Sequence, residues 1–394
     1  MRFNNTHLKS KRFRGYKIKV YPTESQKEIF NKTFNVYRYM YNWTLERISE
    51  YYNAYNKFIG ILDLDSEFRI MRSNTEWIKE IPSHTSREAI RDAYDAYLNF
   101  FKHNAKFPKF KSKKRSKKSF RVRQESNAFY FHENGVKISG LPLNDYLLCK
   151  THNIPVGENI KYYRCTISFD GYEYWLSLNV EKENKQINQE LTDEVIGIDV
   201  GLRTFATLSD GTKFKSPDNH ILINRTKRQS RRIRKMLNSR RNKSVQTRTK
   251  FENIEMSKNE IKLREKYHYT LKRIKDINDS FVHRVSNAII AMKPKKIVIE
   301  DFSVRAMESS RHVAKLLAIN PSLDKFRDQL IYKSIDNGIE LVKANKYFPS
   351  TQLCSRCGSR YKPGTSETYR CPSCGLIIDR DINAAINLKL YADV

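Results

Sequence analysis

The chain has 394 residues and carries 74 Lys or Arg against 43 Asp or Glu, which gives a formal net charge of +31. Such a charge favours binding to a polyanion, and nucleic acid is the first to consider. The sequence contains neither the ~20 consecutive apolar residues of a membrane-spanning helix nor the apolar segment of a signal peptide, so we expect a cytoplasmic protein without a membrane partner. At roughly 150 residues per domain, the length favours two to four domains.

The first predicted elements are a strand and a long helix. Residues 14–20 alternate polar and apolar side chains, Pro22 breaks the alternation, and Thr23 is a suitable helix cap. Apolar or aromatic residues then recur at helical spacing: Ile29, Phe34, Tyr37, Met40, Tyr41 and Leu45. A second helical pattern covers residues 86–102, so residues 23–105 should be mainly helical.

A basic stretch and an alternating region follow. Residues 106–123 hold ten Lys or Arg, three Phe and no acid, a mixture that suits phosphate contacts and base stacking but also a solvated loop. From residue 129 to 180 the chain alternates repeatedly between turns, which predicts a small antiparallel barrel or sheet completed by the N-terminal strand. Two single cysteines in this region, Cys149 and Cys165, are expected to be small buried hydrophobes.

Residues 181–190 are polar enough for a linker, and a new domain is expected from about Leu191. It opens with an apolar strand at 195–201 and a second strand at 205–208. Residues 221–275 then carry 19 Lys or Arg against four Glu, a net charge of +15. Five arginines fall at one-turn helical spacings, which favours a helix that follows a phosphate backbone over a merely soluble one: Arg225, Arg228, Arg231, Arg232 and Arg234.

Three acids stand at comparable places in separate elements. Asp199 lies within an apolar strand, Glu300 ends a second one, and Asp381 opens a final helix. An acid in an apolar strand is costly to bury unless it binds a cation or is fully hydrogen-bonded, so three of them suggest a shared metal ion. Each also has a simpler explanation: Asp199 as a turn residue, Glu300 as an exposed strand end, and Asp379 or Asp381 as a helix cap.

Four cysteines form two Cys-x-x-Cys pairs separated by thirteen residues, and a glycine follows each pair. The ligands would be Cys354, Cys357, Cys371 and Cys374. This spacing is typical of a structural zinc site with all four ligands from the protein; a redox dithiol or unrelated thiols are the alternatives. Glycine permits the tight turn that each pair needs.

Several segments now carry a family resemblance. They are Tyr-Arg-Tyr-Met-Tyr-Asn-Trp-Thr-Leu at 37–45, Val-Ile-Gly-Ile-Asp-Val-Gly at 195–201, Ile-Val-Ile-Glu-Asp at 297–301, Tyr-Phe-Pro-Ser-Thr-Gln-Leu-Cys-Ser-Arg-Cys-Gly at 347–358, and Asp-Arg-Asp-Ile-Asn-Ala-Ala-Ile-Asn at 379–387. Together they resemble the TnpB (OrfB) proteins of small bacterial insertion sequences, which are similar to the smaller type V CRISPR effectors. The likeness covers most of the chain.

The resemblance implies an RNA-guided DNA endonuclease of mixed α/β and β multidomain architecture. It implies a RuvC-like, RNase H-type nuclease domain with an inserted zinc ribbon, a β-barrel wedge domain and a helical recognition module. The implied boundaries are 1–22 and 107–190 for the wedge barrel, 23–106 for the helical module, 191–348 and 377–394 for the nuclease domain, and 349–376 for the ribbon.

The resemblance also implies cofactors, partners and a site. Asp199, Glu300 and Asp381 would hold two catalytic Mg²⁺ ions, with Asp379 as the fallback for the last acid, and the cysteines would hold structural Zn²⁺. The partners would be a guide RNA and double-stranded target DNA, read after recognition of a short target-adjacent motif. We expect a monomer or homodimer in a bacterial or archaeal cytoplasm, associated with the nucleoid.

Charge and position alone nominate further nucleic-acid contacts in the N-terminal half: Arg87, Arg91, Lys113 and Lys114. Two functions of other kinds fit the same features. One is a guided, non-cleaving DNA-binding regulator whose acids are structural. The other is a transposase, or an accessory protein of one, that joins strands at carboxylate-bound metals.

Overall fold

The computed structural model describes residues 12–113, 116–123, 128–132, 135–139, 141, 146–150, 154, 160–182, 190–201, 204–247, 254–301, 321–345, 347–362, 364 and 366–393. The chain divides into two compact units, one formed by Ser10–Asn184 and the other by Lys185–Val394 together with Met1–Lys9. Lys114 and most of the predicted linker lie outside the described residues. Within the part of the chain that the structure describes, no helix has the length and apolarity needed to cross a bilayer.

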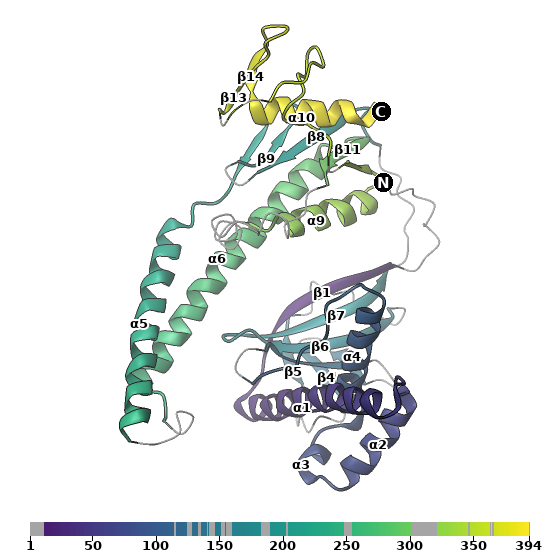
Figure 1. The fold of residues 1–394 in the computed structure, drawn as a ribbon, viewed down its shortest axis with the longest axis vertical. Helices are drawn as coiled ribbons and strands as arrows, with labels where there is room; N and C mark the ends of the chain where they lie inside the picture. Colours follow the sequence, from purple (N-terminus) through teal and green to yellow (C-terminus); the bar gives the residue numbers. More distant parts are fainter. Residues whose placement is uncertain are drawn as a thin grey trace. The chain divides into compact units, whose positions relative to one another are not determined.

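The first unit, Ser10–Asn184, opens with the predicted strand and helices (Figure 1). Thr23 caps the long helix, because its side chain accepts from the Gln26 amide while the Gln26 side chain accepts from the Thr23 amide. The helices are α1 (Glu24–Tyr55), α2 (Ile61–Ser73), α3 (Glu76–Lys79) and α4 (Ser83–Phe101). The prediction of a mainly helical segment over 23–105 is therefore confirmed.

A seven-stranded sheet completes this unit, in the order β2-β6-β7-β1-β5-β4-β3. The strands are β1 (Arg12–Tyr21), β2 (Lys118–Arg123), β3 (Phe129–His132), β4 (Gly135–Ile138), β5 (Leu147–Cys149), β6 (Tyr162–Phe169) and β7 (Tyr174–Lys182). All the described pairings are antiparallel, and β1 lies between β7 and β5. The N-terminal strand thus completes an antiparallel sheet, as predicted.

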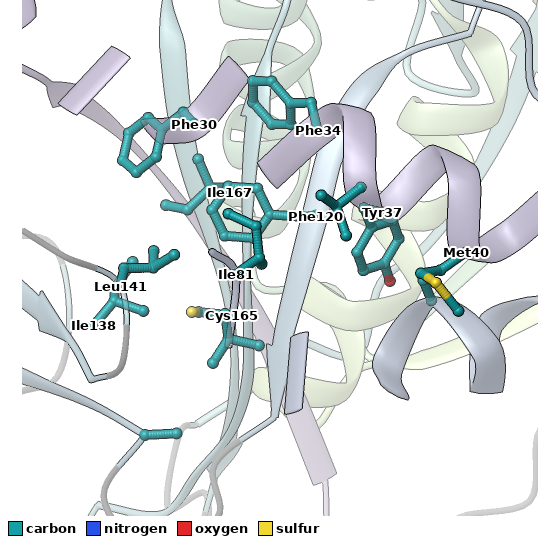
Figure 2. Packing of buried hydrophobic residues seen from close by; sticks show 14 of the residues in the cluster. Phe30, Phe34, Tyr37, Met40, Ile81, Phe120, Ile138, Leu141, Cys165 and Ile167 are labelled. Atoms are coloured by element: carbon teal, nitrogen blue, oxygen red, sulfur yellow. The ribbon is translucent and has the colours of Figure 1, made fainter. Parts of the chain in front are cut away.

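The helices and the sheet share one hydrophobic core. Figure 2 shows Phe30 and Phe34 of α1 beside Phe120 of β2, with Cys165 and Ile167 of β6 behind them. Phe120 is only 1% exposed, so the basic stretch 106–123 ends in a core strand and this ring cannot stack on a base.

Two other predictions about this region can be checked against burial. Phe107 and Phe110 are exposed, as base stacking requires. Cys149 and Cys165 are both buried, which confirms that they are small core hydrophobes.

The second unit is built on a five-stranded sheet of order β10-β9-β8-β11-β12. The strands are β8 (Val195–Val200), β9 (Thr204–Leu208), β10 (Lys213–Lys215), β11 (Lys296–Glu300) and β12 (Glu340–Ala344). Strand β9 pairs with β8 and with β10, in both cases antiparallel, whereas β11 runs parallel to both β8 and β12.

Helices cover both faces of this sheet (Figure 1). They are α6 (Lys258–Ala291) and α9 (Leu323–Asp336) on one face and α10 (Arg380–Leu390), followed by the 3-10 turn η3 (Tyr391–Asp393), on the other. A further helix, α5 (His220–Gln246), packs against α6 (Figure 1). The rings of Phe205, Phe281 and Phe326 join β9, α6 and α9 on one face. Val298 and Val342 pack with Leu388 of α10 on the other face.

The basic segment is helical where the structure describes it, as predicted: α5 and the first half of α6 lie side by side (Figure 1). A small two-stranded sheet, β13 (Thr368–Arg370) and β14 (Ile377–Asp379), precedes α10 without a break. The cysteine-rich segment therefore leads directly into the last helix.

Candidate metal centres and nucleic-acid contacts

Asp199 and Glu300 reach the same end of the central sheet. The parallel pairing of β8 and β11 sets Ile198 opposite Ile299, so the next residue of each strand is an acid. Both isoleucines point into the core beside α6 and α9. Because successive side chains of a strand alternate, Asp199 and Glu300 face the opposite side, on which α10 lies.

The third acid arrives on α10, which touches β8 at Gly197. A Cβ atom at Gly197 would lie 2.0 Å from the Ala385 carbonyl oxygen and 2.4 Å from the Lys389 amide nitrogen. Only a glycine permits this contact between a strand and a helix backbone. Asp381 lies one turn before Ala385 on the same side of the helix, and Asp199 lies two residues after Gly197 on the same face of the strand.

The electrostatics confirm that these carboxylates lie near one another. Burial, together with the charges of Asp381 and Glu300, raises the pKa of Asp199 to about 8. Burial also raises the pKa of Glu300. Clustered acids with raised pKa values are a common sign of a functional site, and a bound cation would relieve their repulsion.

The acids form a looser group than the cysteines do. Among the described residues, only the four cysteines form a set of three or more potential ligands whose atoms all lie within 4.8 Å of one another. The catalytic and metal-binding roles of Asp199, Glu300 and Asp381 therefore stay predictions.

Asp379 has a different environment. Its Oδ1 atom accepts from the amides of Asp381 and Ile382, which makes it the N-cap of α10, and its Oδ2 atom lies 2.6 Å from Lys213 Nζ. Burial works against ionisation of this carboxyl, but these hydrogen bonds hold its pKa below the usual value. Both oxygens are occupied, so the geometry favours Asp381 as the acid that faces Asp199.

The four cysteines fit a tetrahedral metal. Cys354 Sγ lies 3.6 Å from Cys374 Sγ, and Cys357 Sγ lies 3.6 Å from Cys371 Sγ. Ligands at Zn–S distances of ~2.3 Å on a tetrahedron are separated by about 3.8 Å, close to these values. Hydrogen bonds from Ser359 lower the pKa of both Cys357 and Cys371, whereas burial and the three neighbouring thiols raise the pKa of Cys374.

The two halves of this site have the same backbone. Gly358 and Gly375 both have a φ of 71°, and their amides donate to the carbonyls of Cys354 and Cys371. Tyr369 is fully buried between the pairs and forms the small core of the ribbon with Cys354 and Cys371. The glycines that the spacing assigned to tight turns do occupy left-handed positions, as expected.

The five α5 arginines predicted to follow a phosphate backbone are all exposed: Arg225, Arg228, Arg231, Arg232 and Arg234. Arg231 and Arg234 also line a groove of about 610 Å³ between α5, α6 and the start of α9. Lys227, Lys275 and Lys325 line the same groove. The helix thus presents positive charge on more than one side.

Arg87 and Arg91, in contrast, are neutralised by neighbouring acids. Arg87 pairs with Asp65 at 2.7 Å, and Arg91 pairs with Glu88 at 3.1 Å. Glu88 is only 2% exposed and also binds Arg123 at 3.0 Å. Removal of one partner from a buried ion pair is destabilising, so Arg91 has a structural role. Contact of Arg87 and Arg91 with nucleic acid stays a prediction.

Lys113 lies in a different setting, a pocket of about 300 Å³ between α1 and the basic stretch. Its lining includes five cations and no acid: Arg38, Lys111, Lys113, Lys117 and Lys118. Asn31, Asn35 and Arg38 project into it from one side of α1, at spacings of four and three residues. Sequence reasoning missed these three, although polar residues at helical spacing in an aromatic-rich helix were a usable signal.

Lys111 anchors this pocket. Its backbone amide and carbonyl are both hydrogen-bonded by the Asn42 side chain, at 2.7 and 2.9 Å. Its ammonium lies 3.6 Å from the centre of the Tyr41 ring. Burial lowers the pKa of Lys111. The basic segment is therefore held against α1 at this point rather than being a freely solvated loop.

Fold and sites together define a multidomain α/β protein that has a four-cysteine centre, a cluster of partly buried acids and several basic surfaces. Two family models match it: a Cas12f1-like TNB domain over residues 324–388 and the OrfB helix-turn-helix domain over residues 12–57. The second name departs from the structure, in which residues 12–57 form one strand and a single long helix.

Full-length relatives are also similar. A Streptomyces pristinaespiralis protein provisionally named RNA-guided DNA endonuclease is 27% identical over 95% of this chain and 88% of its own length. The protein InsQ of Escherichia coli K12, with the same provisional name, is 26% identical over 96% and 92%. TnpB-like protein L79 of Acanthamoeba polyphaga mimivirus is 25% identical over 94% and 72%.

A solved structure has a similar fold. The chain matches the protein in the cryo-EM structure of a Cas12f1–sgRNA–target DNA complex with a TM-score of 0.52 and 14% identity, over 93% of this chain and 83% of that one. The chain is therefore similar to the TnpB (OrfB) proteins in its family-model matches and in its full-length relatives.

Proposed function

We propose that this chain is an RNA-guided DNA endonuclease of a transposable element and that it cleaves DNA at Asp199, Glu300 and Asp381. The observation that carries the proposal is the approach of these acids from β8, β11 and α10. Burial and the charges of Asp381 and Glu300 together raise the pKa of Asp199 to about 8. The provisional names of two full-length relatives point to the same activity. The sheet order, three antiparallel strands followed by two parallel ones, supports a RuvC-like, RNase H-type nuclease domain.

The acids would hold two Mg²⁺ ions, which supply an activated water and a charge that stabilises the leaving oxygen. The protein's part is to orient these carboxylates. Asp199 must lose its proton to act as a ligand, and cation binding favours that loss. Gly197 sets the height of α10 above β8 and so the position of Asp381, while Asp379 and Lys213 fix the first turn of that helix.

The basic surfaces would hold nucleic acid. The α5 arginines offer guanidinium groups to phosphates, as expected for a guide RNA or its duplex with DNA. The pocket beside α1 has amide and guanidinium groups between lysines, and Asn and Arg are the side chains that read base edges in the DNA major groove. We assign recognition of a target-adjacent motif to Asn31, Asn35 and Arg38.

The decisive experiment compares the wild type with Asp199→Ala, each purified with RNA from the element's end and given a plasmid that bears a matched target. Wild type should cut only with Mg²⁺ present, and Asp199→Ala should lose cleavage by on the order of 10⁴-fold, as when other catalytic units are broken. Both should retain RNA and bind the target equally. Equal cutting by the variant would overturn the assignment.

Two further outcomes separate the other functions. Guided binding without cutting by the wild type, under all metal conditions, would favour the non-cleaving regulator. Strand joining that survives ribonuclease treatment would favour a transposase. A DNA-binding assay with Arg38→Ala against Arg87→Ala tests the recognition pocket, because only the first should reduce discrimination between motif variants.

A further inference from the structure

Two buried asparagines join the cysteine-rich ribbon to the helix that carries Asp381. Asn383 and Asn387 are 0% and 4% exposed and lie one turn apart on α10. A buried amide group is costly unless its hydrogen-bonding atoms find partners. The hydrogen-bond partners of these two side-chain amides therefore identify the segment to which this side of α10 is attached.

All their recorded partners are backbone groups of the ribbon's first loop. Asn383 donates to the Leu353 carbonyl at 2.7 Å and accepts from the Ser355 amide at 3.0 Å. Asn387 donates to the carbonyls of Ser350 and Leu353, both at 2.7 Å. We call these four hydrogen bonds the asparagine clamp.

The loop that the clamp grips is part of the cysteine centre. Ser355 lies inside the first Cys-x-x-Cys turn, and Leu353 directly precedes Cys354. That turn is closed by the Gly358 amide, which donates to the Cys354 carbonyl, and by the Cys354 amide, which donates to Ser359. Metal binding by the four thiolates would fix this turn, and with it the groups that the asparagines bind.

The opposite side of α10 contacts the sheet. Ala385 lies against Gly197, and Asp381 points toward Asp199 from the same side. A helix of eleven residues moves as a rigid body. A displacement of the ribbon loop would therefore move Asp381 relative to the strand acids.

We propose that Asn383 and Asn387 are positioning residues, which couple zinc binding at the four cysteines to divalent-cation binding at Asp199, Glu300 and Asp381. The coupling rests on the proposed function, because it assumes that these acids bind a cation. The four thiolates would take no direct part in DNA cleavage. The ribbon would still affect catalysis, because it would determine the position of Asp381. By thermodynamic reciprocity, a cation at the acids would in turn strengthen zinc binding.

The test measures Mn²⁺ affinity by electron paramagnetic resonance of free Mn²⁺, without RNA or DNA. Wild type should bind Mn²⁺ about tenfold more tightly with zinc than after zinc removal, equivalent to about 1.4 kcal/mol of coupling. Asn387→Leu keeps the side-chain volume but removes both donors. With zinc still bound, it should weaken Mn²⁺ binding about tenfold and abolish the zinc dependence.

Lys389→Ala is the matched control, because Lys389 is exposed on the same helix; it should leave Mn²⁺ affinity and zinc content unchanged. Unchanged Mn²⁺ affinity in zinc-loaded Asn387→Leu, or an equal loss in Lys389→Ala, would overturn the proposal. If Asn387→Leu does not hold zinc, the Mn²⁺ affinity of Asn383→Ala is measured instead, because this variant leaves both Asn387 hydrogen bonds intact. Unchanged Mn²⁺ affinity in zinc-loaded Asn383→Ala would then overturn the proposal. Asp199→Ala separates the two proposals: a variant that still binds Mn²⁺ normally contradicts the acid site itself, not the clamp.

Discussion

The cysteine centre lies next to one member of the acid cluster, Asp381, in the sequence, but the two centres are assembled in different ways. The four thiols come from residues 354–374 and are aligned by two alike turns that close on their own backbone. The three acids come from residues 199–381, and their approach depends on the register of two parallel strands and on a helix seated against Gly197. One centre is a local structure; the other is a product of the whole domain.

This difference determines how each centre responds to damage. A change to the ribbon should remove its own metal and reach the acids only through α10. A change to the sheet or to the contact between α10 and β8 should weaken cation binding at the acids while the ribbon keeps its zinc. Five predictions test or sharpen this contrast, in order of decreasing effect.

Cys354→Ser should unfold the ribbon. Zinc in comparable small sites contributes about 10–16 kcal/mol of apparent folding free energy, and three thiolates cannot complete the tetrahedron. We expect loss of stoichiometric zinc by mass spectrometry and proteolysis within residues 350–376, with the sheet still folded. Soluble protein that holds one zinc per chain after this change would contradict the assignment of the site.

Gly197→Ala should damage the acid cluster and spare the ribbon. The new methyl group would meet two backbone atoms of α10 at 2.0 and 2.4 Å, and backbone cannot swing aside as a side chain can. We expect a loss of about 2–3 kcal/mol in unfolding free energy, typical of overpacking, and at least tenfold weaker Mn²⁺ binding. Gly364→Ala is the control, because a Cβ there has nothing within 4 Å.

Mn²⁺ binding should weaken as the pH falls below 8. The pKa of Asp199 is raised to about 8, so below that pH a proton must leave before the carboxylate can bind a cation, which costs about tenfold in affinity per pH unit for one proton. Titrations at pH 6, 7 and 8 measure the slope. A flat profile between pH 6 and 8 would show that Asp199 is already ionised.

The same shift has a consequence for stability, with the sign fixed by linkage. A carboxyl whose pKa is raised in the folded state binds more protons there than in the unfolded chain. In metal-free protein, the contribution of Asp199 to the free energy of unfolding should therefore be greatest near pH 4 and should decrease as the pH rises toward 8. Asp199→Asn should remove that part of the pH dependence in denaturant titrations.

Asp379→Ala should have the smallest effect, about 1 kcal/mol of stability, because it removes a helix cap and one ion pair. Cleavage should fall only modestly, since the carboxyl is engaged by Lys213 and the helix amides. A loss of cleavage as large as that of Asp199→Ala would make Asp379 the catalytic acid instead of Asp381.

Local patterns in the sequence predicted most of the fold. Thr23 and its capping box, the alternation of β1 and β7, and the two cysteine turns are all determined by residues close together in the chain. The central acids were also identifiable, because an acid at the end of an apolar strand stands out from its neighbours.

What the sequence did not predict depends on partners distant in the chain. Arg87 of α4 looked like a free charge, but Asp65 of α2, 22 residues earlier, pairs with it. Phe120 looked like a stacking residue until the sheet placed it in the core. No sequence pattern around residue 383 indicates that the Asn383 side chain hydrogen-bonds to the Leu353 carbonyl, thirty residues earlier.

The central position of β1 has a consequence for synthesis of the protein. This strand leaves the ribosome first, yet its longest partner, β7, comes about 150 residues later, a delay on the order of ten seconds at 5–20 residues per second. During that interval α1 to α4 can pack around the aromatic residues of α1, while β1 has an open edge. The N-terminal unit is therefore expected to finish folding only after residue 182 has emerged, and a nascent chain stalled before β7 should be prone to aggregation and to proteolysis.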